Sequence, residues 1–346
     1  MKVCYSVYIM NDTLFSDIVG QDAAKKKLGF YLKSYNATRI MPHLMLCAPK
    51  GQGKSTIARE TAKGLVKFND EGKVELKEDG KTPKKKSFVE INASTVKSVK
   101  QFINSVIIPY VVDKDVTVFI DEASEISKDV TMSLLTMLNP NPTNKNTFVY
   151  DDYACDIDFA RQTFIFATSE SHSIFAPLMD RLTRVDLEEY NHNHLAEIVR
   201  KAAPDVNFKE DVELDVATTL RGNARQAVKR SNEIKAYLCG KKKFGKAEWF
   251  DLKNTLSILP LGLSPIELSL LNFMKENPDG SSLTNLSAKT GLSREAVQKD
   301  YEIFLQKQGL MSITAGKGRT ITAKGLEYLK QLEAMNLPYA CAGGKA

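Results

Sequence analysis

The sequence of 346 residues contains few of the residues that build disulfide frameworks or metal clusters, and no long apolar segment. Its five cysteines (Cys4, Cys47, Cys155, Cys239 and Cys341) are scattered and show no metal-ligand spacing, so free thiols in a reducing compartment are expected. No apolar run approaches the roughly 18 residues that a membrane helix needs. The N-terminus lacks the apolar core of a secretory signal. We therefore expect a cytoplasmic protein without a membrane segment.

The net charge and the histidine content also indicate little about function. The formal net charge of +6 is compatible with nucleic-acid binding but does not demand it, because solvated surface lysines give the same sum. Among the four histidines, His192 and His194 are close together but have no third ligand nearby in sequence. That pair indicates the start of a surface helix more than a metal site. The length allows two or three domains, each with its own core.

A glycine-bearing loop is the strongest motif present. The segment Ala48-Pro-Lys-Gly-Gln-Gly-Lys-Ser55 follows the short apolar stretch 44–46 and precedes a helix-like run at 56–58. Strand, glycine loop, Gly-Lys-Ser and helix form the context of a phosphate-binding loop, whose backbone N–H groups face the phosphates. Lys54 would then reach the outer phosphates, and the Ser55 hydroxyl would hold Mg²⁺. Ala48 replaces a usual glycine, which is tolerable if its backbone is not left-handed.

A second motif supports the first. Val116–Ile120 is an apolar, β-branched run that ends in Asp121 and Glu122. Alone, it is equally well explained as a core strand followed by a solvated acidic turn. Together with the loop at Lys54, it predicts a partner site in which Asp121 belongs to the Mg²⁺ shell and Glu122 polarises the attacking water.

Apolar runs alternate with helical patterns along the first half of the chain, which predicts an α/β fold with a parallel sheet and helical crossovers. The expected strands lie at 43–47, 87–92, 115–120 and 162–168, and the expected helices at 23–35, 55–68, 96–107 and 128–138. The charged stretch 69–86 contains Gly and Pro and predicts an exposed insertion, a mobile hairpin. Two short runs within 146–158 predict a second hairpin.

The second half of the chain changes character. Helical patterns at 193–203, 212–221 and 224–239 predict a helical lid, and 261–330 has a helix-turn-helix rhythm followed by a glycine-rich hairpin, as in a winged helix. Such modules usually bind duplex DNA and less often proteins. The predicted domains are 1–186 (ATPase, with the hairpin insertion), 187–259 (lid), 260–332 (winged helix) and 333–346 (a tail whose residues 340–346 are disordered).

Three further features bear on nucleotide sensing, and the first two also have a plain structural interpretation. Thr168-Ser169 at a strand tip predicts a phosphate-sensing hydroxyl, or only a capping one. Arg181 or Arg184 predicts an arginine finger for a neighbouring subunit, or an ion pair with Asp180. Arg225 opens a lid helix and is placed to contact phosphates.

These motifs together resemble the AAA+ ATPases and, more narrowly, the RuvB family of Holliday-junction branch-migration motors. The resemblance extends from about Phe15 to Leu329. It rests on Ile18-Val-Gly20-Gln21, the phosphate loop, Asp121-Glu122, the hairpin at 146–158, Ala167-Thr168-Ser169, Pro177-Leu-x-Asp-Arg181, Arg221-Gly-x-x-Arg225, and Tyr301-Glu-x-Phe-Leu305 through Gly318-Arg319 and Thr322. The family's Asp-Glu-Ile-His is replaced by Asp121-Glu122-Ala-Ser, and the insertion at 69–86 is extra.

The resemblance implies roles for individual residues. ATP would be bound by Ile18, Val19, Pro49, Gly51, Gln52, Gly53, Lys54, Ser55, Thr56 and Arg225, and Mg²⁺ by Ser55 and Asp121. Catalysis would fall to Glu122, Thr168 and Arg181, with Arg184 in reserve, and DNA binding to Arg294, Lys317 and Arg319. The family further implies a homohexameric ring around duplex DNA at a four-way junction, with a RuvA-like partner engaged through the hairpin at 146–158.

Two other functions remain open from the sequence. A clamp-loader-like ATPase would load a sliding clamp in DNA replication without translocating, and would assemble from five subunits. A nucleotide-switched regulator would use the winged helix to read DNA sequence. The first predicts hydrolysis stimulated by a clamp, and the second predicts site-selective footprints on DNA.

Overall fold

The computed structural model describes residues 14–69, 71–151 and 153–334. Within these ranges the chain forms two compact units. The first contains the residues up to Ile198 together with Gly222–Lys229, and the second contains Val199–Arg221 and the residues from Arg230 onward. The predicted disordered tail at 340–346 lies outside the described residues, as do Cys4 and Cys341.

A parallel five-stranded sheet of order β2-β3-β6-β1-β7 lies at the centre of the first unit. Its strands are β1 (Leu44–Cys47), β2 (Ser87–Asn92), β3 (Val116–Asp121), β6 (Gln162–Thr168) and β7 (Thr183–Asp186). β1 and β6 are buried along their whole length, as central strands covered on both faces must be. The four strands predicted from apolar runs are confirmed. β7 was not predicted, because its residues Thr-Arg-Val-Asp contain one buried apolar side chain.

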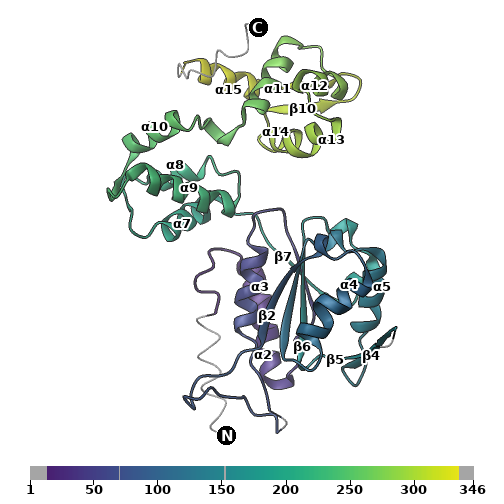
Figure 1. Ribbon diagram of the computed structural model, residues 1–346. Helices are drawn as coiled ribbons and strands as arrows, with labels where there is room; N and C mark the ends of the chain where they lie inside the picture. Colours follow the sequence, from purple (N-terminus) through teal and green to yellow (C-terminus); the bar gives the residue numbers. More distant parts are fainter. Residues whose placement is uncertain (1–13, 70, 152, 335–346) are drawn as a thin grey trace. The chain divides into compact units, whose positions relative to one another are not determined.

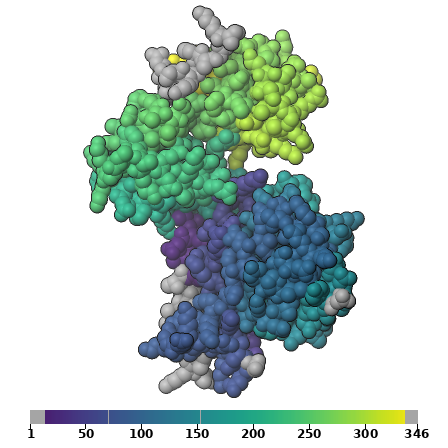
Figure 2. Space-filling model, in the orientation of Figure 1, coloured from purple at the N-terminus to yellow at the C-terminus, as the bar shows by residue number. Residues whose placement is uncertain are grey.

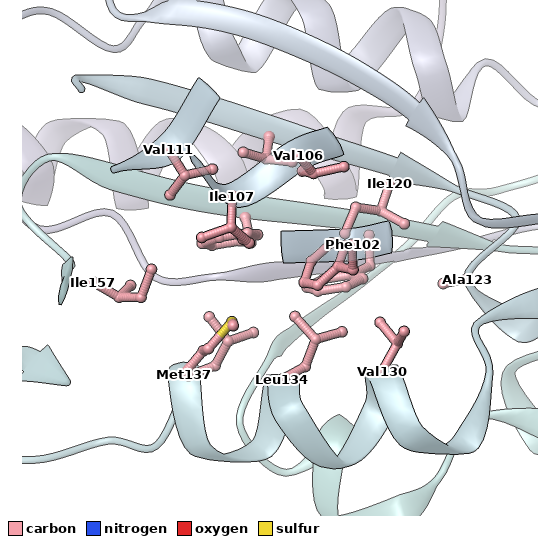
Figure 3. Packing of buried hydrophobic residues seen from close by; sticks show 14 of the residues in the cluster. Phe102, Val106, Ile107, Val111, Ile120, Ala123, Val130, Leu134, Met137 and Ile157 are labelled. Carbon is pink, nitrogen blue, oxygen red and sulfur yellow. The ribbon is translucent and has the colours of Figure 1, made fainter. Parts of the chain in front are cut away.

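Helices cover both faces of the sheet (Figure 1). α2 (Asp22–Thr38) and α3 (Lys54–Lys63) pack on one face, while α4 (Val99–Phe102), the π-helical η2 (Ile103–Val111) and α5 (Lys128–Met137) pack on the other. Alternate residues of each strand point to opposite faces. Figure 3 shows the second core, where Phe102, Ile107 and Leu134 converge beside the sheet. This is the doubly covered parallel sheet that the sequence predicts.

The predicted helix 55–68 is wrong at its end, since α3 stops at Lys63 and Gly64 follows. A Cβ atom on Gly64 would lie 2.9 Å from Leu32, so α2 and α3 approach closely at this point. The chain then pairs with itself through the bridges Val66↔Lys85, Phe68↔Val74 and Leu76↔Pro83. The predicted insertion is therefore confirmed as a hairpin-like segment, and Figure 2 shows it at the surface.

Side-chain caps set the helix boundaries that follow. The predicted helix 96–107 begins later, at Val99, because Ser98 caps it, and it continues as a π-helix with Pro109 inside. Ser127 caps α5 in the same way. The predicted hairpin is confirmed as β4 (Lys145–Tyr150) and β5 (Tyr153–Asp158), which pair antiparallel. The short α6 (Ala176–Met179) precedes β7, and 3-10 turns lie at Ala93–Thr95, Ala123–Glu125, Ser171–Ser173 and Pro260–Gly262.

The second unit contains the lid helices and the winged helix. α7 (His192–Ala202) and α9 (Ala224–Leu238) begin in the first unit and continue here. The other lid elements are α8 (Val212–Ala217), α10 (Lys246–Thr255), β8 (Asn207–Phe208) and β9 (Lys243–Phe244). Helix α10 and the two short strands were not predicted.

The winged-helix module has its own apolar core. It consists of α11 (Pro265–Glu276), α12 (Leu283–Thr290), α13 (Arg294–Ala296), the π-helical η6 (Val297–Glu302), α14 (Ile303–Lys307), the wing strands β10 (Met311–Thr314) and β11 (Gly318–Ile321), and α15 (Ala323–Ala334). Ser293 caps the second helix of the helix-turn-helix. Leu286, Val297 and Leu305 are fully buried, which fixes how these short helices pack.

One lysine lies inside the first unit, at the end of the sheet where β2 begins. Lys86 is 5% exposed; its Nζ donates to the carbonyl of Ala160 at 2.7 Å and stands 5.0 Å above the ring of Tyr35. Burial lowers the pKa of Lys86 from 10.5 to about 8, against the opposing attraction of Asp115 and Asp158. A buried ammonium of this kind makes stability depend on pH.

Candidate nucleotide and DNA sites

The phosphate loop lies between β1 and α3. Gly51 and Gly53 have φ of +83° and +86°, a conformation that glycine adopts without strain. Ala48 has no positive φ, which confirms that alanine is tolerated in place of the usual glycine. The helix begins at Lys54, so the loop presents the backbone N–H groups of a helix N-terminus, a ready anion site.

The Lys54 ammonium is held by its own loop. Its Nζ donates to the carbonyl oxygens of Ala48 at 2.7 Å and Pro49 at 3.1 Å. Burial lowers the pKa of Lys54, while the nearby Asp121 carboxylate opposes that shift. Because both carbonyl partners belong to the phosphate loop, the Lys54 ammonium can exchange them for the oxygens of a phosphate bound in that loop.

Acidic and hydroxyl groups meet at the end of β3. The Ser55 hydroxyl lies 3.3 Å from Asp121 Oδ2, although the two residues are far apart in sequence. Asp121 Oδ1 accepts the backbone N–H of Glu122, whose φ of +54° is left-handed. Oxygen ligands of this kind suit Mg²⁺, which is usually bound by one or two protein groups plus phosphates and water. Ser55 and Asp121 are therefore the residues that could hold a divalent cation.

Asn92 was missed by the sequence analysis. It ends β2 in register with Asp121, and its Nδ2 donates to Glu122 Oε2 at 3.2 Å. The amide thus holds the carboxylate that was predicted to activate water. A polar residue at the end of a predicted neighbouring strand was the only signal for it in the sequence.

The two strand-tip hydroxyls differ in exposure, and one of them makes the cap that was the structural alternative for this tip. Thr168 is 1% exposed, and its hydroxyl accepts the N–H of Glu170 at 2.9 Å. Ser169, the next residue, is exposed. The difference in exposure favours Ser169 over Thr168 as the hydroxyl that reaches a bound phosphate, while Thr168 Oγ1 caps the turn.

The start of α9 contacts the phosphate loop. Asn223 Nδ2 donates to the carbonyl of Lys50 at 3.3 Å, and the N–H of Ala224 donates to Gly51 at 3.1 Å. Gln52 is 4% exposed and donates from Nε2 to the carbonyl of Gly222 at 2.9 Å. Arg225 follows directly and is close enough to Lys54 to lower that lysine's pKa. Gln52 was expected to bind nucleotide, and in this structure its amide joins the loop to α9.

The predicted base-binding segment lies beside the start of α7. Ile18 and Val19 are buried, at 8% and 6% exposure. A Cβ atom on Gly20 would lie 2.9 Å from the His194 ring, which in turn packs edge-on against Tyr190. Aromatic residues near the expected base subsite were not predicted. The His194 ring can lie this close to the segment because residue 20 is a glycine and has no Cβ atom.

The two candidate finger arginines differ in their surroundings. Arg181 donates to the carbonyls of Leu135 at 3.1 Å and Pro177 at 2.7 Å, and to the side chain of Asn139 at 3.1 Å. Arg184 lies on β7 with its side chain half exposed and is paired with Asp186 at 2.7 Å. The structure records neither residue in an ion pair with Asp180, which was the structural alternative considered for this segment.

The wing arginine forms an internal ion pair. Arg319 on β11 donates from Nε and Nη2 to the two oxygens of Glu302, at 2.9 and 3.2 Å. The side chains are only 15% and 2% exposed. Lys317 is exposed at the wing tip, and Arg294 is exposed at the start of the second helix. The geometry therefore leaves Lys317 and Arg294 more accessible to DNA than Arg319.

Three absences hold for the part of the chain that the structure describes. None of its helices combines the length and hydropathy needed to cross a bilayer. No group of three or more His, Cys, Asp or Glu side chains is arranged to hold a metal ion there, and His192 and His194 therefore form no such cluster. Cys47, Cys155 and Cys239 are free thiols within the same ranges.

Comparison with protein-family models gives two matches. Residues 44–191 match the model described as the ATPase family associated with various cellular activities (AAA). Residues 260–330 match the model described as the RuvB C-terminal winged helix domain. Both domains that the motifs predicted are thus confirmed, including the winged helix that distinguishes the closer resemblance.

Whole-chain comparisons agree. The chain is 25% identical over 337 residues to the Holliday junction branch migration complex subunit RuvB of Fusobacterium nucleatum, covering 92% of each. It is 25% identical over 342 residues to the same subunit of Thermotoga maritima, covering 94% of this chain and 93% of that one. A solved structure titled as the Thermotoga maritima RuvB Holliday junction branch migration motor has a TM-score of 0.68 at 22% identity, covering 90% and 95%. This structural likeness confirms the fold class.

Proposed function

Because this chain belongs to the RuvB family of AAA+ ATPases, we propose that it is an ATP-driven DNA translocase that migrates the branch point of Holliday junctions. The observation that carries the proposal is the meeting of Ser55, Asp121 and Glu122 beside the phosphate loop, in a chain that also has a RuvB-type winged helix. The proposed domains are those of the sequence analysis, with boundaries at 187 and 260.

The proposed hydrolytic step follows from the positions of the side chains. Lys54 leaves its loop carbonyls and binds the outer phosphates of ATP, while loop N–H groups bind the inner ones. Ser55 and Asp121 would hold Mg²⁺, which would supply positive charge to neutralise the phosphates. Glu122 orients and deprotonates the attacking water once it leaves the Asn92 amide. The base is bound near Ile18 and Val19.

Sensing of the nucleotide is assigned to two groups within the subunit and one from a neighbour. Arg225 at the start of α9 contacts the phosphates, and the Thr168-Ser169 tip reports on the outermost one. Arg181 is proposed to act in trans, with Arg184 in reserve, which requires a homohexameric ring. The Arg181 guanidinium must then exchange at least one of its present carbonyl partners for phosphate oxygen.

DNA binding is assigned to the winged helix, through contacts of Arg294 and Lys317 with the DNA backbone, while Arg319 positions the wing through its ion pair with Glu302. The hairpin β4–β5 is the proposed docking site for a RuvA-like partner. Its Val149 and Tyr153 side chains are 67% and 49% exposed, which makes an apolar surface available on an antiparallel hairpin.

The test is ATP-dependent dissociation of a synthetic four-way DNA junction by the purified protein, with and without a RuvA-type partner. Glu122→Gln is the control, since it keeps the shape of the side chain and removes the base. Separation of the strands that requires both ATP and Glu122 supports the proposal. Lack of separation, with hydrolysis stimulated instead by a sliding clamp, would support the clamp-loader function and overturn it.

A further inference from the structure

Four consecutive residues, Arg221 to Ala224, make side-chain or backbone contacts in both compact units. We call them the link segment. The boundary between the units falls inside it, between Arg221 and Gly222. Its first residue binds the winged helix, and its other three bind the phosphate loop.

The Arg221 guanidinium is held by two groups of the winged-helix module. Its Nη2 and Nη1 donate to the two oxygens of Glu267, at 2.7 and 3.3 Å. Glu267 is fully buried, and its Oε2 also accepts the N–H and hydroxyl of Ser264, at 2.7 and 3.0 Å. The guanidinium carbon lies 3.6 Å from the centre of the Phe304 ring, a cation–π contact with α14. Arg221 therefore binds both α11 and the C-terminal part of the continuous helix that begins at Arg294.

The backbone of the same region approaches the winged helix without side chains between. A Cβ atom on Gly262 would lie 2.2 Å from the carbonyl oxygen of Thr219, a distance that no side chain could occupy. The lid corner just before Arg221 is therefore in direct contact with the segment that leads into α11. This contact and the Arg221 ion pair fix the lid corner to the winged-helix module at two points.

The other end of the link segment is bonded to the phosphate loop. Gly222 accepts a hydrogen bond from the Gln52 amide, and Ala224 donates one to Gly51. Asn223 donates to Lys50, while its Oδ1 accepts the N–H groups of Arg225 and Gln226 and so caps α9. A Cβ atom on Gly51 would lie only 2.1 Å from Asn223 Oδ1, which shows how closely the loop and the helix start approach.

We propose that Arg221 is a positioning residue that couples the nucleotide state of the phosphate loop to the winged helix through the link segment. A movement of Lys50, Gly51 or Gln52 when phosphates bind is passed to residues 222–224, because three hydrogen bonds join them. Arg221 is the next residue, and its side chain passes the movement to Glu267 and Phe304. The inference rests on the proposed function, in which ATP turnover moves DNA held by the winged helix.

A purely structural ion pair is the alternative, and the chain offers a matched control for it. Arg200 donates from Nε to Glu213 Oε1 at 2.7 Å, and Glu213 is 3% exposed. This pair also neutralises a buried carboxylate of the second unit, but its two residues belong to the lid helices α7 and α8. Loss of either pair should cost stability, and only loss of the Arg221 pair should cost coupling.

The test compares wild type with a double variant, Arg221→Met with Glu267→Gln. Removal of the arginine alone would leave an unpaired buried carboxylate, so the second change removes the charge and keeps an oxygen for Ser264. The control double variant is Arg200→Met with Glu213→Gln. For each protein we would measure kcat and KM for ATP without DNA, the affinity for duplex DNA, and the factor by which DNA stimulates kcat.

The expected result is a selective loss. The Arg221 double variant should keep its basal kcat, KM and DNA affinity, while the DNA stimulation factor falls about fivefold or more, the lower range of measured coupling between sites. The control should keep the wild-type factor. Stimulation at the wild-type level in the Arg221 double variant, or an equal loss in the control, would overturn the inference.

A second measurement separates this inference from the proposed function. Spin labels are placed at the exposed positions Lys100→Cys and Lys330→Cys, in a chain whose five native cysteines are replaced by alanine. Wild type should show a distance distribution that changes with a non-hydrolysable ATP analogue, and the Arg221 double variant should not. If DNA fails to stimulate wild-type hydrolysis, the proposed function fails, yet this distance still tests the coupling. An unchanged distance in wild type, or the same change in the variant, would overturn the inference that Arg221 couples the two sites.

Discussion

The Arg319–Glu302 pair makes the most specific prediction about the wing. Removing Arg319 by Arg319→Met leaves the Glu302 carboxylate, 2% exposed, without its bidentate partner. Loss of one member of a buried pair costs about 3–5 kcal/mol, because an uncompensated charge remains in a dry site. The double variant Arg319→Met with Glu302→Gln removes that charge, and we expect it to recover most of the loss.

Hydrogen exchange reports this cost locally, without the assumption that two units unfold as one. The backbone N–H groups of Ser281 and Arg319 donate to each other's carbonyls at 2.8 and 2.9 Å, so their exchange measures opening of the wing. Both amides should exchange faster in the single variant, by a factor that corresponds to about 3–5 kcal/mol if the whole cost appears as opening. They should return close to the wild-type rate in the double variant.

DNA binding gives the second half of the test. The logarithm of the DNA-binding constant falls linearly with the logarithm of the salt concentration, and each lost phosphate contact reduces the magnitude of this negative slope by about 0.9. If Arg319 mainly positions the wing, the double variant should bind duplex DNA with the wild-type slope, while Lys317→Ala should lose about one unit. A reduced slope in the double variant would refute this reasoning and support the direct DNA contact predicted from the sequence. Unchanged exchange in the single variant would show that the ion pair does not hold the wing.

Three further predictions concern the ATPase unit. Glu122→Gln should leave the Kd for ATP within about threefold and lower kcat by about 10²–10⁴, the usual contribution of a general base, and turnover at the wild-type rate would contradict its role. Gly51→Ala forces a side chain into φ +83° and against Asn223. For about 1–2 kcal/mol of strain, the nucleotide affinity measured by calorimetry should fall about tenfold. Gly29→Ala, with open space around the added methyl group, should leave the affinity unchanged. Lys86 has its folded pKa lowered to about 8 from 10.5, so the unfolded chain binds more protons between these values and stability rises with pH there. Urea unfolding from pH 7.5 to 10 should show most of this rise, about 2 kcal/mol, in wild type relative to Lys86→Met, and parallel pH profiles would contradict it.

Local chemistry explains why the centre of the site was predictable. The Gly51 and Gly53 conformations, the Lys54-Ser55 helix start and the Asp121-Glu122 strand end each follow from a few adjacent residues. The same is true of the serine caps at the helix starts.

What the sequence did not reveal depends on residues that come together only in the folded chain. Asn92 meets Glu122 because β2 and β3 pair in one register, and nothing in either segment alone fixes that register. Asn223 meets Gly51 across about half of the chain. The family resemblance implied that Arg319 contacts DNA, but its buried partner Glu302 lies on another element.

The two-sided burial of β6 has a consequence for how the chain selects its register. A strand with one polar face resists a one-residue slip, because slippage would expose its apolar side chains. β6 lacks that protection, since every one of its residues is buried. Discrimination must come from volume instead: Phe164 and Phe166 fill the core beside α5, while Ile165 and Ala167 lie under α3. A slipped strand would press phenyl rings against the helix that carries Lys54 and leave voids on the opposite face. It would also break the hydrogen bonds of the buried Gln162 side chain to Val111 and Lys114, so steric fit and these bonds together secure the alignment of this strand.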